Sequence, residues 1–331
     1  MEQNEPKGII LDRGNVLLLD KRNQKILSML MTNARVANAV IAKELQLSKS
    51  NIGRRIENLE ASHIIGEYQT YIDATTLGFI TSIVFIKTKC TQEQKEAYLT
   101  FLAEQREIYG VLEPTGVYDL VLAFYSKGTK QKETILENLL NNTCVKDFFV
   151  LSARTLFPPH NLFNVPAHKT PFPSFIHPAS PISFDRLDLA FLERLSSDCR
   201  VSYVELADAF HISRETVRYR IHRLIKARVI TKFQPVINLF LLGFEAYMLM
   251  IKLVRPTQKE NIATFIASTH QCNTLLLTET LFDIVCFINL KNNKEFRAFE
   301  NELTSRFKDA IYEYSFEIIK KQNKLDWFPR A

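Results

Sequence analysis

The sequence predicts an α+β protein built as two copies of one unit, each with a helix-turn-helix followed by a small βαββαβ domain. Three observations lead to this prediction: a long internal repeat, a helical apolar pattern opening each copy, and alternating strand-like and helix-like segments after it. With 331 residues and a hydrophobic content of 46%, the chain is long enough for several domains with cores of their own.

The repeat aligns residues 19–79 with residues 184–244 without a gap, at an offset of 165 positions. Most apolar positions stay apolar in both copies. Chance would not keep one register over such a length, so the chain is two copies of one unit. Identical pairs include Asp20 and Asp185, Leu27 and Leu192, Arg35 and Arg200, Ser48 and Ser213, Arg55 and Arg220, and Gly78 and Gly243.

The second copy opens with three predicted helices. Apolar residues over 187–195 form the stripe of the first helix. The second helix begins at Ser202, where Glu205 completes a capping box. Ser213 is the expected N-cap of the third helix. The buried stripe of that helix is expected to be Val217, Ile221 and Leu224.

The outer face of this third helix is strongly basic. The segment 214–232 holds seven basic residues and one acidic residue, a net charge of +6 that equals the charge of the whole chain. Such a helix suits the DNA major groove, where Arg and Lys neutralise phosphates and Arg can bind guanine. A solvated basic face is the alternative, and its repetition in two copies argues against it. The predicted DNA contacts are Arg214, Glu215, Thr216, Arg218, Tyr219, Arg220 and Arg223.

The matching helix of the first copy buries Ile52, Ile56 and Leu59 and is less basic. Residues 48–61 carry three basic and two acidic side chains, a net charge of +1. Gly53 also lowers helix stability by roughly 1 kcal/mol relative to Ala. We therefore expect the two helices to contribute unequally to DNA affinity. The predicted contacts of the first copy are Lys49, Ser50, Asn51, Arg54, Arg55 and Asn58.

Each copy continues with a strand-like hinge, residues 66–79 or 231–244, and then a βαββαβ series. This order implies a ferredoxin-like fold with an antiparallel sheet, one apolar face of which should bury against another sheet. The first copy is expected to have strands at 80–89, 108–114, 118–126 and 145–157 and helices at 91–105 and 132–142. The second copy is expected to have strands at 246–254, 272–279, 282–290 and 311–322 and helices at 257–269 and 293–306.

The stretch between the copies holds seven prolines over residues 157–183, which predicts an extended connector. Its histidines, His160, His168 and His177, match no metal-site spacing, so no metal is expected. The domains expected are an N-terminal extension at 1–16, helix-turn-helix domains at 17–67 and 183–232, sensor domains with their hinges at 68–157 and 233–331, and a linker at 158–182.

Five scattered cysteines without a C-x-x-C pair argue against a zinc ribbon and a disulfide framework, and they suit a reducing cytosol. The amino-terminal residues lack the pattern of a signal peptide, and the apolar runs are too short for a membrane span. We therefore expect a cytoplasmic protein with no membrane partner.

Residues 19–79 and 212–230 resemble the winged helix-turn-helix of the leucine-responsive/asparagine-synthase regulator (Lrp/AsnC) family. The segment "TGVYDLVL" (115–122) is similar to the G-x-Y-D turn of the ligand-sensing domain of that family. The resemblance covers nearly the whole chain, twice. It implies two winged helix-turn-helix domains and two ferredoxin-like sensor domains packed as an intrachain pseudo-dimer. It also implies a sequence-specific transcription regulator that binds double-stranded DNA and whose pseudo-dimers are able to pair further.

The resemblance further implies a small-molecule effector, with an amino acid as the family default, at this turn. The matching positions are Gly116, Tyr118 and Asp119. The second copy keeps Asp283 but has Thr280 in place of the glycine, which removes the freedom to adopt a positive φ angle. The second pocket is therefore in doubt, and a purely structural turn is the alternative for the first.

Two other classes remain open. Siroheme decarboxylases share this architecture, but an R-R-F-G stretch and a nearby histidine mark them, whereas this chain has "GEYQTYID" and "TKFQPVIN" there. Nine glycines leave little material for a phosphate-binding loop, so we expect neither catalytic residues nor a cofactor. The third class is a ligand-sensing adaptor with vestigial DNA-binding heads. The weak charge of the first copy favours it, and the basic segment 213–230 argues against it.

Overall fold

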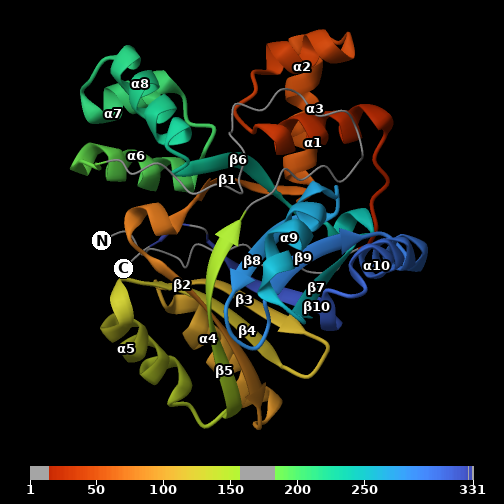
Figure 1. Ribbon diagram of the computed structural model, residues 1–331. Coiled ribbons are helices and arrows are strands. Elements are labelled where there is room, and N and C mark those ends of the chain that lie inside the picture. The colour runs from red at the N-terminus through yellow and green to blue at the C-terminus, as the bar shows by residue number, and fades with distance from the viewer. Residues whose placement is uncertain (1–14, 157–182, 327, 330–331) are drawn as a thin grey trace.

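The computed structural model describes residues 15–156, 183–326 and 328–329. The expected linker lies outside the described residues, as does nearly all of the expected N-terminal extension. Two separate helical heads lie above a body of strands flanked by helices, and a two-stranded ribbon runs between heads and body (Figure 1). No helix in the described part of the chain has both the length and the apolar character needed to cross a membrane.

Both heads are three-helix units, as predicted. The N-caps predicted at Ser202 and Ser213 and the capping box of Ser202 with Glu205 are confirmed. Gln46 and His211, at matched positions, both adopt φ 53° and close the tight turn before the third helix. The helices of the first head are α1 (Lys21–Thr32), α2 (Asn38–Leu45) and α3 (Lys49–Ala61). Those of the second head are α6 (Arg186–Ser197), α7 (Tyr203–Phe210) and α8 (Arg214–Lys226).

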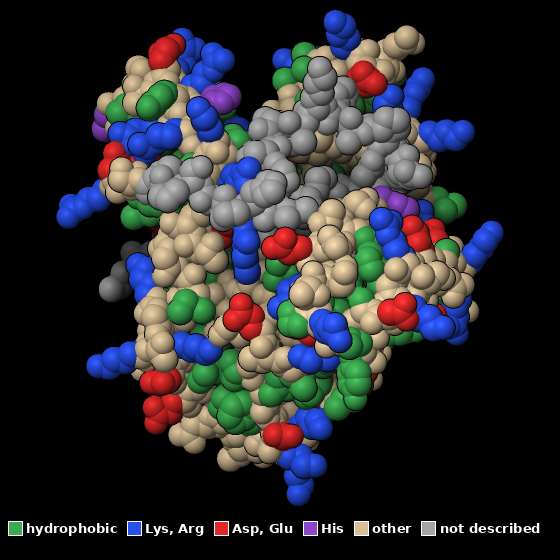
Figure 2. Space-filling view, in the orientation of Figure 1, with side chains coloured by type: hydrophobic (Ala, Val, Ile, Leu, Met, Phe, Trp, Pro, Cys, Tyr) green, Lys and Arg blue, Asp and Glu red, His purple; other side chains and the backbone are tan. Residues whose placement is uncertain are grey.

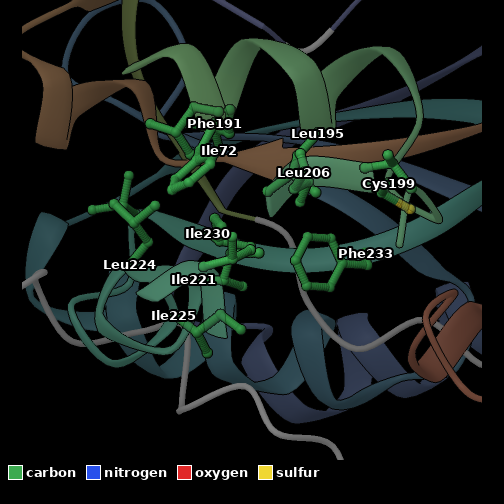
Figure 3. Packing of buried hydrophobic residues seen from close by; sticks show 14 of the residues in the cluster. Ile72, Phe191, Leu195, Cys199, Leu206, Ile221, Leu224, Ile225, Ile230 and Phe233 are labelled. Atoms are coloured by element: carbon green, nitrogen blue, oxygen red, sulfur yellow. The ribbon is translucent and has the colours of Figure 1, made fainter. Parts of the chain in front are cut away.

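The predicted apolar stripes of α3 and α8 are buried, and each head core includes residues of the other copy. In the second head, Phe191 and Leu195 of α6 pack over Ile221 of α8 and over Ile72, which belongs to the first copy (Figure 3). In the first head, Phe244 of the second copy joins the core in the same way. Neither copy therefore completes its head core alone.

The hinge strands cause this exchange. Strands β1 (Ile65–Ile72) and β6 (Ile230–Ile237) pair antiparallel as a two-stranded ribbon, with Tyr68 opposite Pro235 and Tyr71 opposite Lys232. Helix α6 packs on β1, and helix α1 packs on β6. The ribbon thus places each head against the hinge strand of the other copy.

The two sensor domains have the predicted βαββαβ order. The first consists of β2 (Ile80–Thr88), α4 (Gln92–Glu104), β3 (Ile108–Pro114), β4 (Leu120–Ser126), α5 (Gly128–Leu140) and β5 (Val145–Leu156). The second consists of β7 (Glu245–Leu253), α9 (Lys259–Ser268), β8 (Cys272–Thr278), β9 (Ile284–Leu290), α10 (Asn293–Phe307) and β10 (Ile311–Leu325). Short 3-10 turns follow the hinges, η1 (Ala74–Leu77) and η2 (Phe240–Leu242), and η3 (Pro256–Gln258) precedes α9.

The two sensor sheets join edge to edge into a closed barrel of order β10-β3-β4-β2-β5-β8-β9-β7. The joins between the copies are β5 with β8 and β10 with β3. The apolar sheet faces meet inside, where Phe85 and Leu151 of the first copy pack with Met248, Met250 and Val285 of the second. The expected burial of one sheet against another is therefore confirmed, and it occurs within one chain.

Candidate nucleic-acid interface

Helices α3 and α8 each present a polar outer face on an exposed head. Figure 2 shows Lys and Arg side chains spread over the outer surface of both heads. On α8, Arg214, Glu215, Arg218 and Tyr219 are exposed, and Thr216 is half-buried. Tyr219 is 67% exposed, which is unusual for a large aromatic side chain and leaves its ring available to a partner.

Two of the predicted contacts on α8 are engaged inside the head. Arg220 donates to Asp185 at 2.7 Å and to Asp188 at 2.9 Å, and Arg223 donates to the other oxygen of Asp188. The Asp188 side chain is fully buried, so this ion-pair network fixes α8 on α6. Arg220 and Arg223 therefore orient the helix, while Arg218 is the arginine at the centre of its exposed face.

The first head has a reduced version of this network. Arg55 donates to Asp20 and to Asn23, each at 2.8 Å, and its Nε donates to Asn51 at 3.0 Å. Asn23 occupies the position that Asp188 holds in the second head. The remaining predicted contacts of this helix, Lys49, Ser50, Arg54 and Asn58, are exposed.

The carboxylates that begin α1 and α6 are tuned in the same direction. Backbone N–H groups of the first helical turn and the paired arginine hold the pKa of Asp20 and of Asp185 below the usual range. Each carboxylate therefore stays ionised at neutral pH and acts as both helix cap and ion-pair partner.

A pair of arginines, neither of them predicted from the sequence, joins the two heads. Arg35 follows α1 and donates to the backbone carbonyls of Cys199, at 2.5 Å, and Val201, at 2.8 Å. Its copy, Arg200, donates to Asn38 at 3.1 Å and lies 5.0 Å above the Tyr68 ring. The identity of Arg35 and Arg200 across the repeat was the available signal, because nothing local requires arginine there.

The residues expected at an effector turn are used within the chain. A Cβ added to Gly116 would collide with the Glu317 side chain, which accepts from the Val117 N–H at 3.0 Å. Tyr118 is half-buried and packs edge-on against Phe85, whose side chain lies in the barrel interior. Burial raises the pKa of Glu317 above its ordinary value. The turn thus receives a side chain of the other copy.

The matched aspartates have the same backbone role. Asp119 accepts from the Thr88 N–H at 2.6 Å, and Asp283 accepts from the Leu253 N–H at 2.9 Å. Asp283 also lies 3.3 Å from Lys252 and 3.6 Å from Lys259. Asp119 therefore joins the end of β2 to the turn before β4, and Asp283 joins the end of β7 to the turn before β9.

Comparison with known proteins agrees with this arrangement. The family model of the AsnC-type helix-turn-helix domain matches twice, at residues 19–60 and 184–225. The chain is 32% identical over 108 residues to the HTH-type transcriptional regulator Ptr1 of Methanocaldococcus jannaschii, which is 33% of this chain and 73% of that protein. It is 30% identical over 115 residues to an uncharacterized HTH-type transcriptional regulator of Pyrococcus furiosus, which is 35% of this chain and 78% of that protein.

The crystal structure of the siroheme decarboxylase NirDL is similar over nearly all of the chain, with a TM-score of 0.60 at 15% identity. The similarity covers 93% of this chain and 94% of that one, and at this identity it shows the fold alone. The two regulators each match over most of their own length, and the AsnC-type helix-turn-helix domain occurs twice in this chain. The chain belongs to the AsnC-type family of helix-turn-helix transcriptional regulators, as a tandem duplication.

Proposed function

We propose that this protein binds a two-part DNA site sequence-specifically. Helices α8 and α3 are the reading helices, meaning the ones that contact the bases, with α8 as the stronger and α3 as the weaker. The observation that carries the proposal is the exposed polar face at the same register of two linked heads. The exposed set on α8 is Arg214, Glu215, Arg218 and Tyr219.

The linkage between the heads supports a single operator with two half-sites. Arg35 and Arg200 join one head to the other, and the β1–β6 ribbon lies beneath both. Two heads held in a fixed relation accept only half-sites of matching separation. In this proposal one chain supplies the pair of heads for which other DNA-binding proteins need a dimer.

The test is fluorescence anisotropy of the full chain with its own promoter DNA and with a scrambled duplex, each over a salt series. We expect tight promoter binding that persists at physiological salt and weaker, salt-sensitive binding to the scrambled duplex. Arg218→Ala should weaken promoter binding. The matched control is Arg297→Ala, which removes an exposed arginine from α10, outside the heads.

Equal binding to the two duplexes, lost together as salt rises, would contradict sequence-specific recognition. It would leave the sensor domains as the functional part, in an adaptor with vestigial heads. An unchanged affinity in Arg218→Ala would contradict only the assignment of α8 as the stronger reading helix, and not the proposal that the protein binds DNA.

A siroheme-decarboxylase-like activity is the second candidate, because the fold similarity to NirDL extends over nearly all of the chain. The residue pattern argues against it: the stretches that would carry its motifs form the paired strands β1 and β6, without the arginine pair or the histidine. Tetrapyrrole absorbance of the purified protein, or saturable binding of an added iron tetrapyrrole, would support the siroheme-decarboxylase-like activity.

A further inference from the structure

A cavity of about 120 Å³ lies where the first head, the hinge ribbon and the barrel meet. Its wall includes Met31 of α1, Gln234 of β6, Phe287 of β9 and Ile319 of β10. The wall is mostly apolar, and none of the described residues that line it is charged. None of the residues expected at the effector turn belongs to it.

Two side-chain amides in this wall have hydrogen atoms without acceptors. Asn289 is 5% exposed, and its Nδ2 is buried with no hydrogen-bond partner among the described residues. The Nε2 atom of Gln322 is likewise buried with no hydrogen-bond partner among the described residues. Another amide of the wall, that of Gln234, donates to the Met31 carbonyl at 2.6 Å. Buried donors are rarely left unpaired in folded proteins, so the two free ones indicate an occupant that accepts hydrogen bonds.

The matched place in the first half is filled. Strand pairing sets Asn289 opposite Ala246, and Tyr125 opposite Thr81 at the corresponding position. The bulged residue of the neighbouring strand is Asn273 in one half and Tyr109 in the other. Tyr109 and Tyr125 stack with centroids 4.2 Å apart, and both are almost fully buried. Two asparagines thus stand in the second half where two tyrosine rings occupy the first.

We propose that this cavity is a binding site for a small, neutral, mostly apolar molecule with a carbonyl-type hydrogen-bond acceptor. An apolar cavity of about 150 Å³ holds a benzene ring, so the occupant is about that size. The amides of Asn289 and Gln322 would donate to its acceptor. A free amino acid does not fit, because its ammonium and carboxylate groups would be buried without counter-charges.

The position of the cavity would allow an occupant to regulate DNA binding by the first head, and this part rests on the proposed DNA-binding function. Its wall combines Met31 of the first head with strands of the second sensor domain. An occupant therefore touches both, and its binding would change how firmly α1 is held against the barrel. Occupancy itself requires no DNA and is tested without it.

The experiment uses the full chain labelled with ¹³C at its methionine methyl groups, with the Met31 resonance assigned from a Met31→Leu variant. Cyclohexanone, benzene and L-leucine are titrated separately to millimolar concentration. We expect a saturable Met31 shift with cyclohexanone, at least several-fold weaker binding of benzene, and no saturable shift with leucine. Because no DNA is present, a failure of DNA recognition does not affect the result.

The double variant Asn273→Tyr, Asn289→Tyr copies the filled half and should abolish the cyclohexanone shift. Asn301→Tyr, on the exposed face of α10, is the matched control and should retain it. The thermal unfolding midpoint shows whether the double variant folds, and the three-ligand comparison in the unmodified chain needs no variant. No saturable Met31 shift with cyclohexanone, an equal shift in a folded double variant, or tighter binding of leucine would overturn the proposal.

Discussion

The head formed by α6–α8 and the head formed by α1–α3 share a backbone and differ in what anchors the reading helix. In the second head the buried Asp188 carboxylate binds two arginines, Arg220 and Arg223. In the first head Asn23 stands at that position and accepts from Arg55 alone. The more basic reading helix thus has the more strongly charged anchor. On α8, two arginines are therefore fixed on α6 while Arg214 and Arg218 stay exposed.

The two sensor domains also carry different residues at matched positions. Glu317 is buried opposite Met248, at the position where the first half has Leu151 opposite Ile83, and it reaches the turn at Gly116. At the junction with the heads, the first half is packed with tyrosines and the second retains a cavity. Duplication has kept the fold and left each half with different chemistry at matched places.

The largest expected effect tests the anchor. Asp188→Ala removes the partner of two guanidinium groups and should lower the free energy of unfolding by about 3 kcal/mol, because breaking a buried ion pair leaves charge uncompensated. Chemical denaturation followed by circular dichroism measures it. Asn23→Ala, the matched change in the first head, should cost only about 1 kcal/mol. Equal losses would show that the two anchors are equivalent.

The next effect tests the bridge between the heads. Arg35→Ala removes two hydrogen bonds to carbonyls and should cost about 2 kcal/mol of stability. Arg200→Ala removes one, and the Nη1 of Arg200 is buried without a partner among the described residues, so its cost should be about half as large. Thermal unfolding of the two variants side by side decides the order, and the reverse order would contradict this interpretation.

A smaller effect concerns DNA. Arg218→Ala should weaken promoter binding about tenfold if the arginine reads a base, while Arg54→Ala should weaken it about threefold. The reason is the net charge of each reading helix with its N-cap, which is +4 over residues 213–226 and +1 over the matched residues 48–61. Anisotropy titrations at one fixed salt concentration give the ratio. Equal losses in the two variants would mean that the heads contribute equally.

The smallest effect depends on pH. The pKa of Glu317 is raised by burial, so its contribution to stability is present below its ordinary value near 4.5 and is lost as pH rises through the raised value. Glu317→Gln keeps an acceptor for Val117 and should raise the unfolding midpoint by a few degrees at pH 8 and hardly at all at pH 4. Glu313→Gln, exposed on the same strand, is the control. A pH-independent difference would contradict the assigned cause.

Much of the fold could be predicted because short segments of the sequence determine most of its helices and strands. Capping residues, apolar spacings of three and four, and strand alternation act within about 15 residues, and the helices and strands follow them closely. Because the repeat presents each element twice, the same pattern predicts it in both copies. The predicted stripes of α3 and α8 and the cap at Ser213 are confirmed on these grounds.

The sequence predicts the candidate interface only as a set of positions, which the structure divides into two groups. Arg218 and Arg220 are alike in sequence, two residues apart on one helix. Arg220 faces Asp185 and Asp188 on α6, whereas Arg218 is exposed. Only the packing of α6 against α8 distinguishes an anchoring arginine from one available to DNA.

The duplication, the element order, the basic reading helix and the need for the sensor sheets to bury a face all follow from the amino-acid sequence. The β1–β6 ribbon, the contacts of Arg35 and Arg200 between the heads, and the cavity beside Asn289 arise only in the folded chain. Each of these depends on residues from both copies, about 160 or more positions apart in the ribbon and the bridges. Local propensity carries no information about such pairs, because their energy exists only once the two copies have packed together.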